Sequence, residues 1–186
     1  AVSLVERQLS VLRQKDLTHE RKLKELLEVA RANDALAEKI HRLTLRLLAA
    51  QGLTESLDVV EDGLRADFGA DQSVLVLFGE SANFGDIQSG RFFKAAPRDD
   101  DGLKAFETFL KGSGPRCGQI RDAQRDYLFG KKTDEIGSAA LIPLGSASDI
   151  GFLAIGSADS ERFHPGMSID FLSRLGQLVT EALKRY

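Results

Sequence analysis

The first 51 residues contain neither glycine nor proline, although the 186-residue chain has 17 Gly and 4 Pro. Both residue types interrupt helices, so a segment of this length without them favours one unbroken helix. At about 1.5 Å per residue, fifty residues of helix extend roughly 75 Å. Most of these turns cannot pack on a domain as small as the remaining chain would form. The sequence therefore predicts a long N-terminal helix over residues 1–51 and a domain over residues 52–186.

The helical segment carries a heptad repeat. With Val2 at position a, five of the seven d positions are Val, Leu or Ile. Such a seam is typical of a helix that pairs with another helix, and the expected partner is a second copy of the chain in a coiled coil. Asp16, His19 and Asn33 interrupt the seam, and a buried polar residue at one such position can fix the register, while the other interpretation of Asp16 and His19 is a loosened stretch. The predicted dimer interface consists of Val5, Leu9, Leu12, Leu23, Leu26, Ala30, Asn33 and Ile40.

Charge and composition exclude several classes of protein. Residues 1–50 hold ten Lys/Arg against seven Asp/Glu, or +3, and residues 51–186 hold fifteen against twenty-one, or −6. No dense basic patch exists for a nucleic acid partner, because phosphate neutralisation needs concentrated positive charge. The longest apolar runs, Val74–Phe78 and Phe152–Ile155, are too short to cross a membrane. A single cysteine fits a reducing compartment, so we expect a cytoplasmic protein.

The domain shows alternating strand and helix signals. Apolar runs predict four strands, at residues 73–78, 91–96, 138–144 and 150–157. Two middle helices are expected around residues 99–110 and 122–128, and amphipathic helices open and close the domain. Because short links join strands that are neighbours in sequence, we expect an α+β fold with a largely antiparallel sheet. The terminal helices should cover one face of this sheet and the middle helices the other.

Three segments of the domain resemble the GAF superfamily of small α/β sensor modules. They are the helix–glycine–strand passage 64–78, the hairpin 138–157 and the closing helix. More narrowly, the chain resembles the DUF484 family, bacterial GAF-like proteins with a long N-terminal helix and no assigned activity. The phrases that carry this resemblance are Ala30–Asp34, Leu128–Gly130, Gly137–Leu144, Gly156–Asp159 and Arg162–Gly166. The resemblance implies a GAF-like fold with a ligand pocket between the sheet and the middle helices.

No group of residues has the spacing of a catalytic or metal site. Cys117 is the only cysteine, so the chain lacks a second thiol for redox chemistry. His19 and His41 lie in the predicted helix, and His164 stands at the entrance of the closing helix. The acidic run Asp99–Asp101 fits a helix cap better than a cation site. We therefore expect a non-catalytic protein without cofactor or metal, with a thiol enzyme centred on Cys117 as a third hypothesis.

Apolar and cationic side chains near the middle helices indicate a ligand pocket. The candidate lining residues are Phe93, Phe106, Phe109, Cys117, Leu128 and Phe129, and the candidate cationic rim consists of Lys94, Arg116 and Arg121. This mixture suits a small aromatic or anionic ligand. The first hypothesis is therefore a dimeric, GAF-like sensor or signalling module. The alternative is a structural adaptor, in which the Phe side chains fill a second core layer and the helix binds protein partners.

Overall fold

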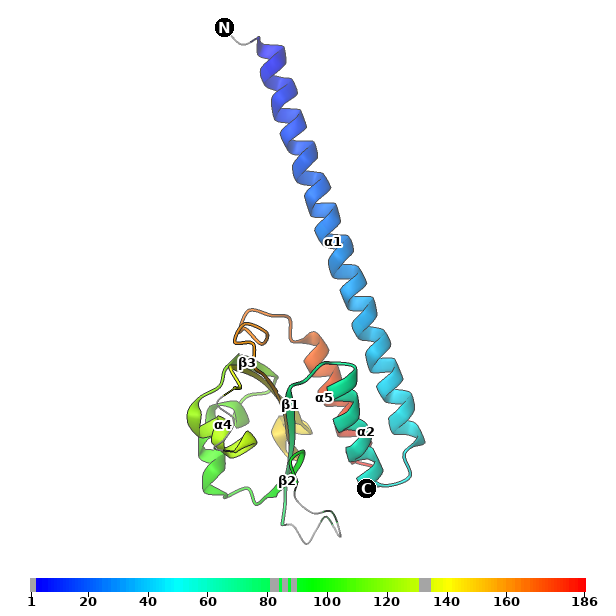
Figure 1. Ribbon diagram of the computed structural model, residues 1–186, viewed down its shortest axis with the longest axis vertical. Coiled ribbons are helices and arrows are strands. Elements are labelled where there is room, and N and C mark those ends of the chain that lie inside the picture. The colour runs from blue at the N-terminus through cyan, green and yellow to red at the C-terminus, as the bar shows by residue number, and fades with distance from the viewer. Residues whose placement is uncertain (1–2, 81–83, 85–86, 88–89, 131–134) are drawn as a thin grey trace. The chain divides into compact units, whose positions relative to one another are not determined.

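The computed structural model of the chain describes residues 3–80, 84, 87, 90–130 and 135–186. It divides into two compact units, Ala1–His41 and Arg42–Tyr186. The long helix α1 (Leu4–Ala49) is continuous and crosses this division, so its C-terminal turns belong to the second unit (Figure 1). The long N-terminal helix predicted from the lack of glycine and proline is therefore confirmed.

A five-stranded sheet forms the centre of the second unit, with strand order β2-β1-β5-β4-β3. The strands are β1 (Gln72–Phe78), β2 (Phe93–Ala96), β3 (Arg116–Gln119), β4 (Ser138–Leu144) and β5 (Gly151–Ser157). The helices are α2 (Leu53–Ala66), the 3-10 helix η2 (Asp101–Phe106), α3 (Glu107–Leu110), α4 (Asp122–Phe129), the 3-10 turn η3 (Ser146–Ser148) and α5 (Asp170–Leu183). Helices α2 and α5 lie on one side of the sheet and α4 lies on the other (Figure 1), as the sequence predicts.

The sheet is largely antiparallel, as expected, with one parallel pairing. β4 and β5 form the predicted antiparallel hairpin, and β1 and β3 also pair antiparallel with their neighbours. β2 instead runs parallel to β1, with Phe93 beside Leu75. Parallel neighbours need a long crossover, and the connection from Phe78 to Phe93 is long enough to return the chain to the starting end of β1.

Two elements differ locally from the sequence prediction. β3 lies at the sheet edge with its end residues, Arg116 and Gln119, exposed, so its four residues lack the apolar pattern of a buried strand. The expected helix after the acidic run begins as the 3-10 helix η2. The Asp100 carboxylate accepts a hydrogen bond from the Gly102 N–H at 2.7 Å, which is the capping role expected for this run.

The core has one layer on each face of the sheet. Successive side chains of β1 alternate between the faces, so Val74 and Val76 belong to the layer under α4, and Leu75 faces the opposite way. On that opposite face, Gly63 of α2 allows close contact with α1. A Cβ atom at Gly63 would lie 2.8 Å from Cδ1 of Leu43.

The C-terminal turns of α1 are fixed to the domain. Leu43 and Leu47 are buried, at 0% and 2% exposure. Arg42 forms an ion pair with Asp67 at 2.6 Å, and the Arg185 guanidinium donates to the Leu47 carbonyl at 3.2 Å. The C-terminal end of α1 therefore packs on the domain.

Candidate functional site

A cavity of about 800 Å³ lies at one edge of β1. β2 pairs with β1 only from Leu75 onward, so Gln72, Ser73 and Val74 extend beyond the start of β2. The Leu75 N–H donates to the Phe92 carbonyl at 2.6 Å, and backbone groups two residues apart in a strand point the same way. The backbone N–H and carbonyl of Ser73 therefore face the edge that β2 does not reach. We call this space the edge cavity.

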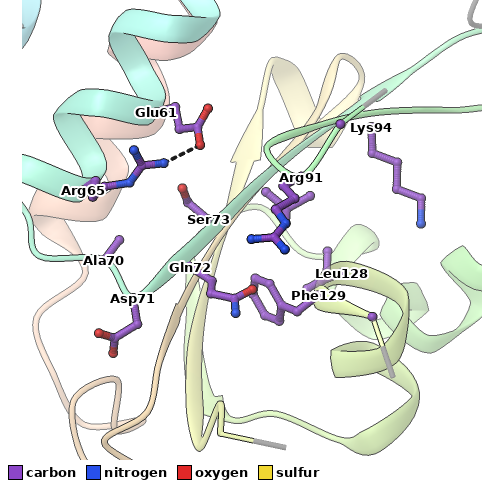
Figure 2. Close-up of a pocket in the computed structure, with 13 residues that line it drawn as sticks. Glu61, Arg65, Ala70, Asp71, Gln72, Ser73, Arg91, Lys94, Leu128 and Phe129 are labelled. Carbon is purple, nitrogen blue, oxygen red and sulfur yellow. Dashed lines mark hydrogen bonds and ion pairs between the residues drawn. The ribbon is translucent and has the colours of Figure 1, made fainter. Parts of the chain in front are cut away.

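Leu128 and Phe129, at the end of α4, provide the apolar surface of the edge cavity (Figure 2). The Phe129 ring lies against Gly156 of β5, where an added Cβ would lie 2.9 Å from the ring. The missing side chain at Gly156 therefore leaves room for this ring. The full lining comprises Glu61, Arg65, Ala70, Asp71, Gln72, Ser73, Val74, Gly90, Arg91, Lys94, Leu128, Phe129 and Gly130.

Three charged side chains that line the edge cavity already have partners within the protein. Glu61 and Arg65 form an ion pair at 2.6 Å along α2 (Figure 2). Asp71 accepts hydrogen bonds from the Ala158 N–H at 2.9 Å and the Ser157 hydroxyl at 3.0 Å. The hydrogen bond from Ala158 is the main reason why the pKa of Asp71 lies below its usual value. These groups are therefore already neutralised or hydrogen-bonded by the fold.

Arg91 and Lys94 differ in how they are held. The Lys94 ammonium donates to the Tyr127 carbonyl at 2.9 Å and lies 3.6 Å from the centroid of the Tyr127 ring. Desolvation by burial lowers the pKa of Lys94. Arg91 is exposed, and it has no hydrogen bond or ion pair with any residue that the structure describes. Its guanidinium points toward Gln72 and Phe129 (Figure 2), so Arg91 is a cation available to a bound molecule.

Aromatic rings pack in the centre of the space between the sheet and the middle helices. Phe106 and Phe109 are buried, at 0% and 3% exposure, and their ring centroids lie 5.2 and 5.6 Å from that of Phe152. Leu128 belongs to the same cluster. Rings at these separations are in direct contact, so this layer is a packed part of the core.

The nine predicted pocket residues line three cavities, two of which share Glu61, Gly90 and Arg91. Lys94, Leu128 and Phe129 line the edge cavity. A smaller cavity of about 210 Å³ beside β3 is lined by Phe106, Phe109, Arg116, Cys117 and Arg121. Phe93 lines a third cavity of about 770 Å³, together with Leu57 and Phe92. The structure thus brings the predicted residues together in part, and it places Arg91 and Ser73, which were not predicted, in the edge cavity.

The whole chain, residues 1–186, matches the sequence model of a family described as "Protein of unknown function, DUF484". The chain belongs to the DUF484 family. It is 26% identical over 189 residues to "Uncharacterized protein YigA" from Salmonella typhimurium (strain LT2), a match that covers 100% of this chain and 77% of that protein.

The first of two similar solved structures shows that this DUF484 chain has a GAF-like fold. The phycoerythrobilin-bound GAF domain from a cyanobacterial phytochrome matches with a TM-score of 0.52 at 13% identity, covering 83% of this chain and 100% of that one. The phycocyanobilin-bound GAF domain from a cyanobacterial phytochrome matches with a TM-score of 0.49 at 15% identity, covering 80% and 91%. The predicted resemblance to both family and fold is confirmed.

Nucleophilic and metal-ligating groups of the DUF484 chain are dispersed. Burial raises the pKa of the Cys117 thiol, which keeps it protonated at neutral pH. His164 Nδ1 accepts a hydrogen bond from the Gly166 N–H at 3.2 Å, within a turn. Across the described part of the chain, no three His, Cys, Asp or Glu side chains gather as a metal site would require. Nor does any helix within that part have the length and apolarity needed to span a membrane.

The predicted dimer face of α1 is exposed over most of its length. Its five large residues are between 48% and 65% exposed, namely Val5, Leu9, Leu12, Leu23 and Leu26. Ala30 and Asn33 are also exposed, whereas Ile40 is half-buried. These exposed side chains form an apolar surface, and packing against another helix would bury it.

Proposed function

We propose that this DUF484 protein is a non-catalytic, cytoplasmic sensor or signalling module that binds a small anionic ligand with an aromatic group in the edge cavity. It forms a homodimer through the exposed seam of α1. We propose no cofactor. The domain has a net charge of −6 by the count of its residues, which disfavours a nucleic acid partner.

The anionic character of the proposed ligand rests on Arg91. Its guanidinium has no partner among the described residues, and it lies at the mouth of a cavity whose other ionic groups are engaged. A guanidinium binds carboxylate or phosphate through two parallel hydrogen bonds. The Phe129 ring supplies an adjacent apolar surface for a planar group, and the Ser73 backbone offers a donor and an acceptor.

Helix α2 provides a route from the edge cavity to α1. Glu61 and Arg65 line the cavity, while Gly63 between them contacts Leu43 of α1. A ligand that binds two positions of α2 with different affinity would shift the packing of Leu43. The sensor would then transmit ligand binding as a change at the base of α1.

Calorimetric titration with phenyl phosphate, benzoate and inorganic phosphate tests the ligand class, with neutral benzamide as the uncharged comparison. We expect phenyl phosphate to bind most tightly and Arg91→Ala to weaken it at least tenfold. Arg174→Ala removes the same charge from an exposed position on α5 and should leave binding unchanged. Equal binding by the Arg91→Ala variant, or no binding of either aromatic anion to the unaltered protein, would contradict the proposal.

Light scattering tests the dimer. The protein should have twice the chain mass at micromolar concentration, and charged residues placed together at Leu9, Leu12 and Leu26 should halve that mass without unfolding the domain. A monomeric mass for the unaltered chain would refute dimerisation.

The second candidate function is a structural adaptor that binds protein partners through α1. The packed ring layer around Phe106 favours it, because Phe106, Phe109 and Phe152 occupy the centre of the space where the GAF resemblance implies a pocket, and only the smaller cavity of about 210 Å³ remains beside β3. Native mass spectrometry of freshly purified protein distinguishes the two functions. A small molecule that co-purifies with the unaltered chain and is lost from Arg91→Ala supports the sensor, and its repeated absence supports the adaptor.

A further inference from the structure

We infer that the second copy of the chain docks on α1 antiparallel, with the two-fold axis between Leu17 and Thr18, so that Asp16 of each copy faces the partner's His19. This inference rests on the proposed homodimer and specifies its orientation and register. It explains why the centre of the seam holds two polar residues three positions apart, Asp16 and His19.

The helix keeps its heptad register through these polar residues. α1 is helical without interruption from Leu4 to Ala49, so Asp16 and His19 stay on the same face as the leucines around them. Both polar residues are exposed, as are the leucines before and after them. The heptad positions before Asp16 and after His19 therefore belong to one continuous register.

The part of the seam that is free for a partner ends before the domain. Leu36 and Ile40 are half-buried, and Leu43 and Leu47 are fully buried in the chain's own fold. The exposed stretch thus runs from the beginning of α1 to Asn33. Its midpoint falls close to Asp16 and His19, where a two-fold axis would have to lie if both copies use the same exposed stretch.

Antiparallel pairing about this axis places the polar residue Asp16 opposite a polar residue and the neighbouring leucines opposite apolar residues. In an antiparallel coiled coil, each a residue faces a d residue of the partner. With Asp16 opposite the partner's His19, Leu12 faces the partner's Leu23, Leu9 faces the partner's Leu26 and Val5 faces the partner's Ala30. A carboxylate and an imidazole are complementary in hydrogen bonding, and the three leucine, valine and alanine layers on either side are apolar. Asn33 is the remaining polar seam position of the exposed stretch, and it lies at the end of the paired stretch, where water can satisfy its amide.

Other arrangements pair the polar residues badly. In a parallel dimer in register, Asp16 faces the partner's Asp16, and two carboxylates in one desolvated layer repel each other. Sliding the antiparallel pair by one heptad in either direction places Asp16 against the partner's Leu12 or Leu26. Both shifts leave a polar group in an apolar layer without a partner.

The flanking charges add one attraction and one repulsion. Arg13 lies beside the partner's Glu20, twice by symmetry, and these opposite charges attract. Lys15 lies beside the partner's Lys22 at the solvent-exposed rim, where water and salt screen the repulsion between their long side chains. The central Asp16–His19 layers and the leucine layers therefore decide the register.

Disulfide trapping tests the orientation in a Cys117→Ser background. We make Leu12→Cys and Leu23→Cys separately, and one chain carries a longer tag so that mixed dimers differ in size. Antiparallel pairing brings residue 12 of one copy within disulfide distance of residue 23 of the other, whereas two copies of residue 12 lie far apart along the helix. We expect the mixture to give at least tenfold more covalent dimer than either variant alone.

Covalent dimers from Leu12→Cys alone overturn the orientation, and a dimeric protein without cross-links in the mixture overturns the register. Both results leave the proposed dimer intact. A monomeric mass by light scattering overturns the dimer itself and, with it, this inference.

Exchange of the two polar residues gives an independent check. Asp16→His should weaken the dimer about tenfold because it places His against His, and the double variant Asp16→His with His19→Asp should restore the affinity. Failure of the double variant to restore dimerisation in sedimentation equilibrium would overturn the pairing.

Discussion

Truncation of Phe106 tests whether the layer between the sheet and the middle helices is packed or open. Phe106 is 0% exposed, and its ring centroid lies 5.2 Å from that of Phe152 and 5.6 Å from that of Tyr127. In Phe106→Ala, the lost transfer free energy of the ring is about 2 kcal/mol. A residual cavity of about 100 Å³ adds about 2 kcal/mol at roughly 24 cal/mol per Å³. The free energy of unfolding should therefore fall by about 4 kcal/mol.

Urea unfolding followed by tyrosine fluorescence measures this loss, because both tyrosines of the chain, Tyr127 and Tyr186, belong to the second unit. A loss of this size corresponds to a fall in Tm of about 8–16 °C. The new cavity is apolar, so benzene should bind it and raise the Tm of Phe106→Ala, as it does in comparable engineered cavities. Benzene should leave the unaltered protein unchanged.

Phe68→Ala is the matched control. Phe68 is half-buried and pairs with Phe171 at 5.1 Å, so its loss should cost less and create no enclosed cavity for benzene. A loss below about 1 kcal/mol in Phe106→Ala, or stabilisation of the unaltered protein by benzene, would show that the layer is open and that the reasoning is wrong.

Three further substitutions test individual contacts of the domain. Tyr127→Phe should leave the Tm unchanged or raise it, because the buried hydroxyl has no hydrogen-bond partner among the described residues; a fall of more than about 1 kcal/mol would reveal a missed partner. Gly151→Ala should cost about 3 kcal/mol or more in urea unfolding, since φ is +154° and the added Cβ would lie 2.0 Å from the Val76 carbonyl oxygen; a loss under about 1 kcal/mol contradicts this geometry. Asp71 has a lowered pKa in the folded state, so its contribution is present above about pH 4 and is lost as the pH falls through the folded pKa. Asp71→Asn should therefore lower the free energy of unfolding by about 1 kcal/mol at pH 7 and show a smaller decrease on acidification; a pH dependence like that of the unaltered protein would refute the assignment.

Local sequence signals were sufficient for the elements that depend mainly on their own residues. The continuous helix follows from the lack of glycine and proline before Gly52, and the β4–β5 hairpin follows from two apolar runs joined by a short link. The parallel pairing of β2 and the existence of β3 depend instead on which strand lies beside them. Arg116 and Gln119 are tolerated in β3 because the strand is at the sheet edge. The local sequence pattern does not indicate which strand will lie at the edge.

The candidate site was less predictable than the fold, for a related reason. The edge cavity exists because β2 begins opposite Leu75 and leaves Ser73 uncovered, which is a matter of strand register. Arg91 is the first residue of the predicted strand segment 91–96 and lies two residues before β2, so the sequence indicated its location but not its lack of an ionic partner. Phe106 and Phe109 were identified as apolar and near the middle helices, but composition does not distinguish a pocket wall from a packed core.

Because α1 is one unbroken helix, the number of residues between its exposed seam and its buried leucines sets the angle between them around the helix axis, which we call the phase. Each residue turns an α-helix by about 100°, so one residue inserted between Asn33 and Leu43 would rotate the exposed seam by about that angle around the helix axis relative to the buried leucines. An insertion of seven residues would rotate it by only about 20°. Insertions and deletions in this stretch are therefore constrained to lengths that preserve the phase.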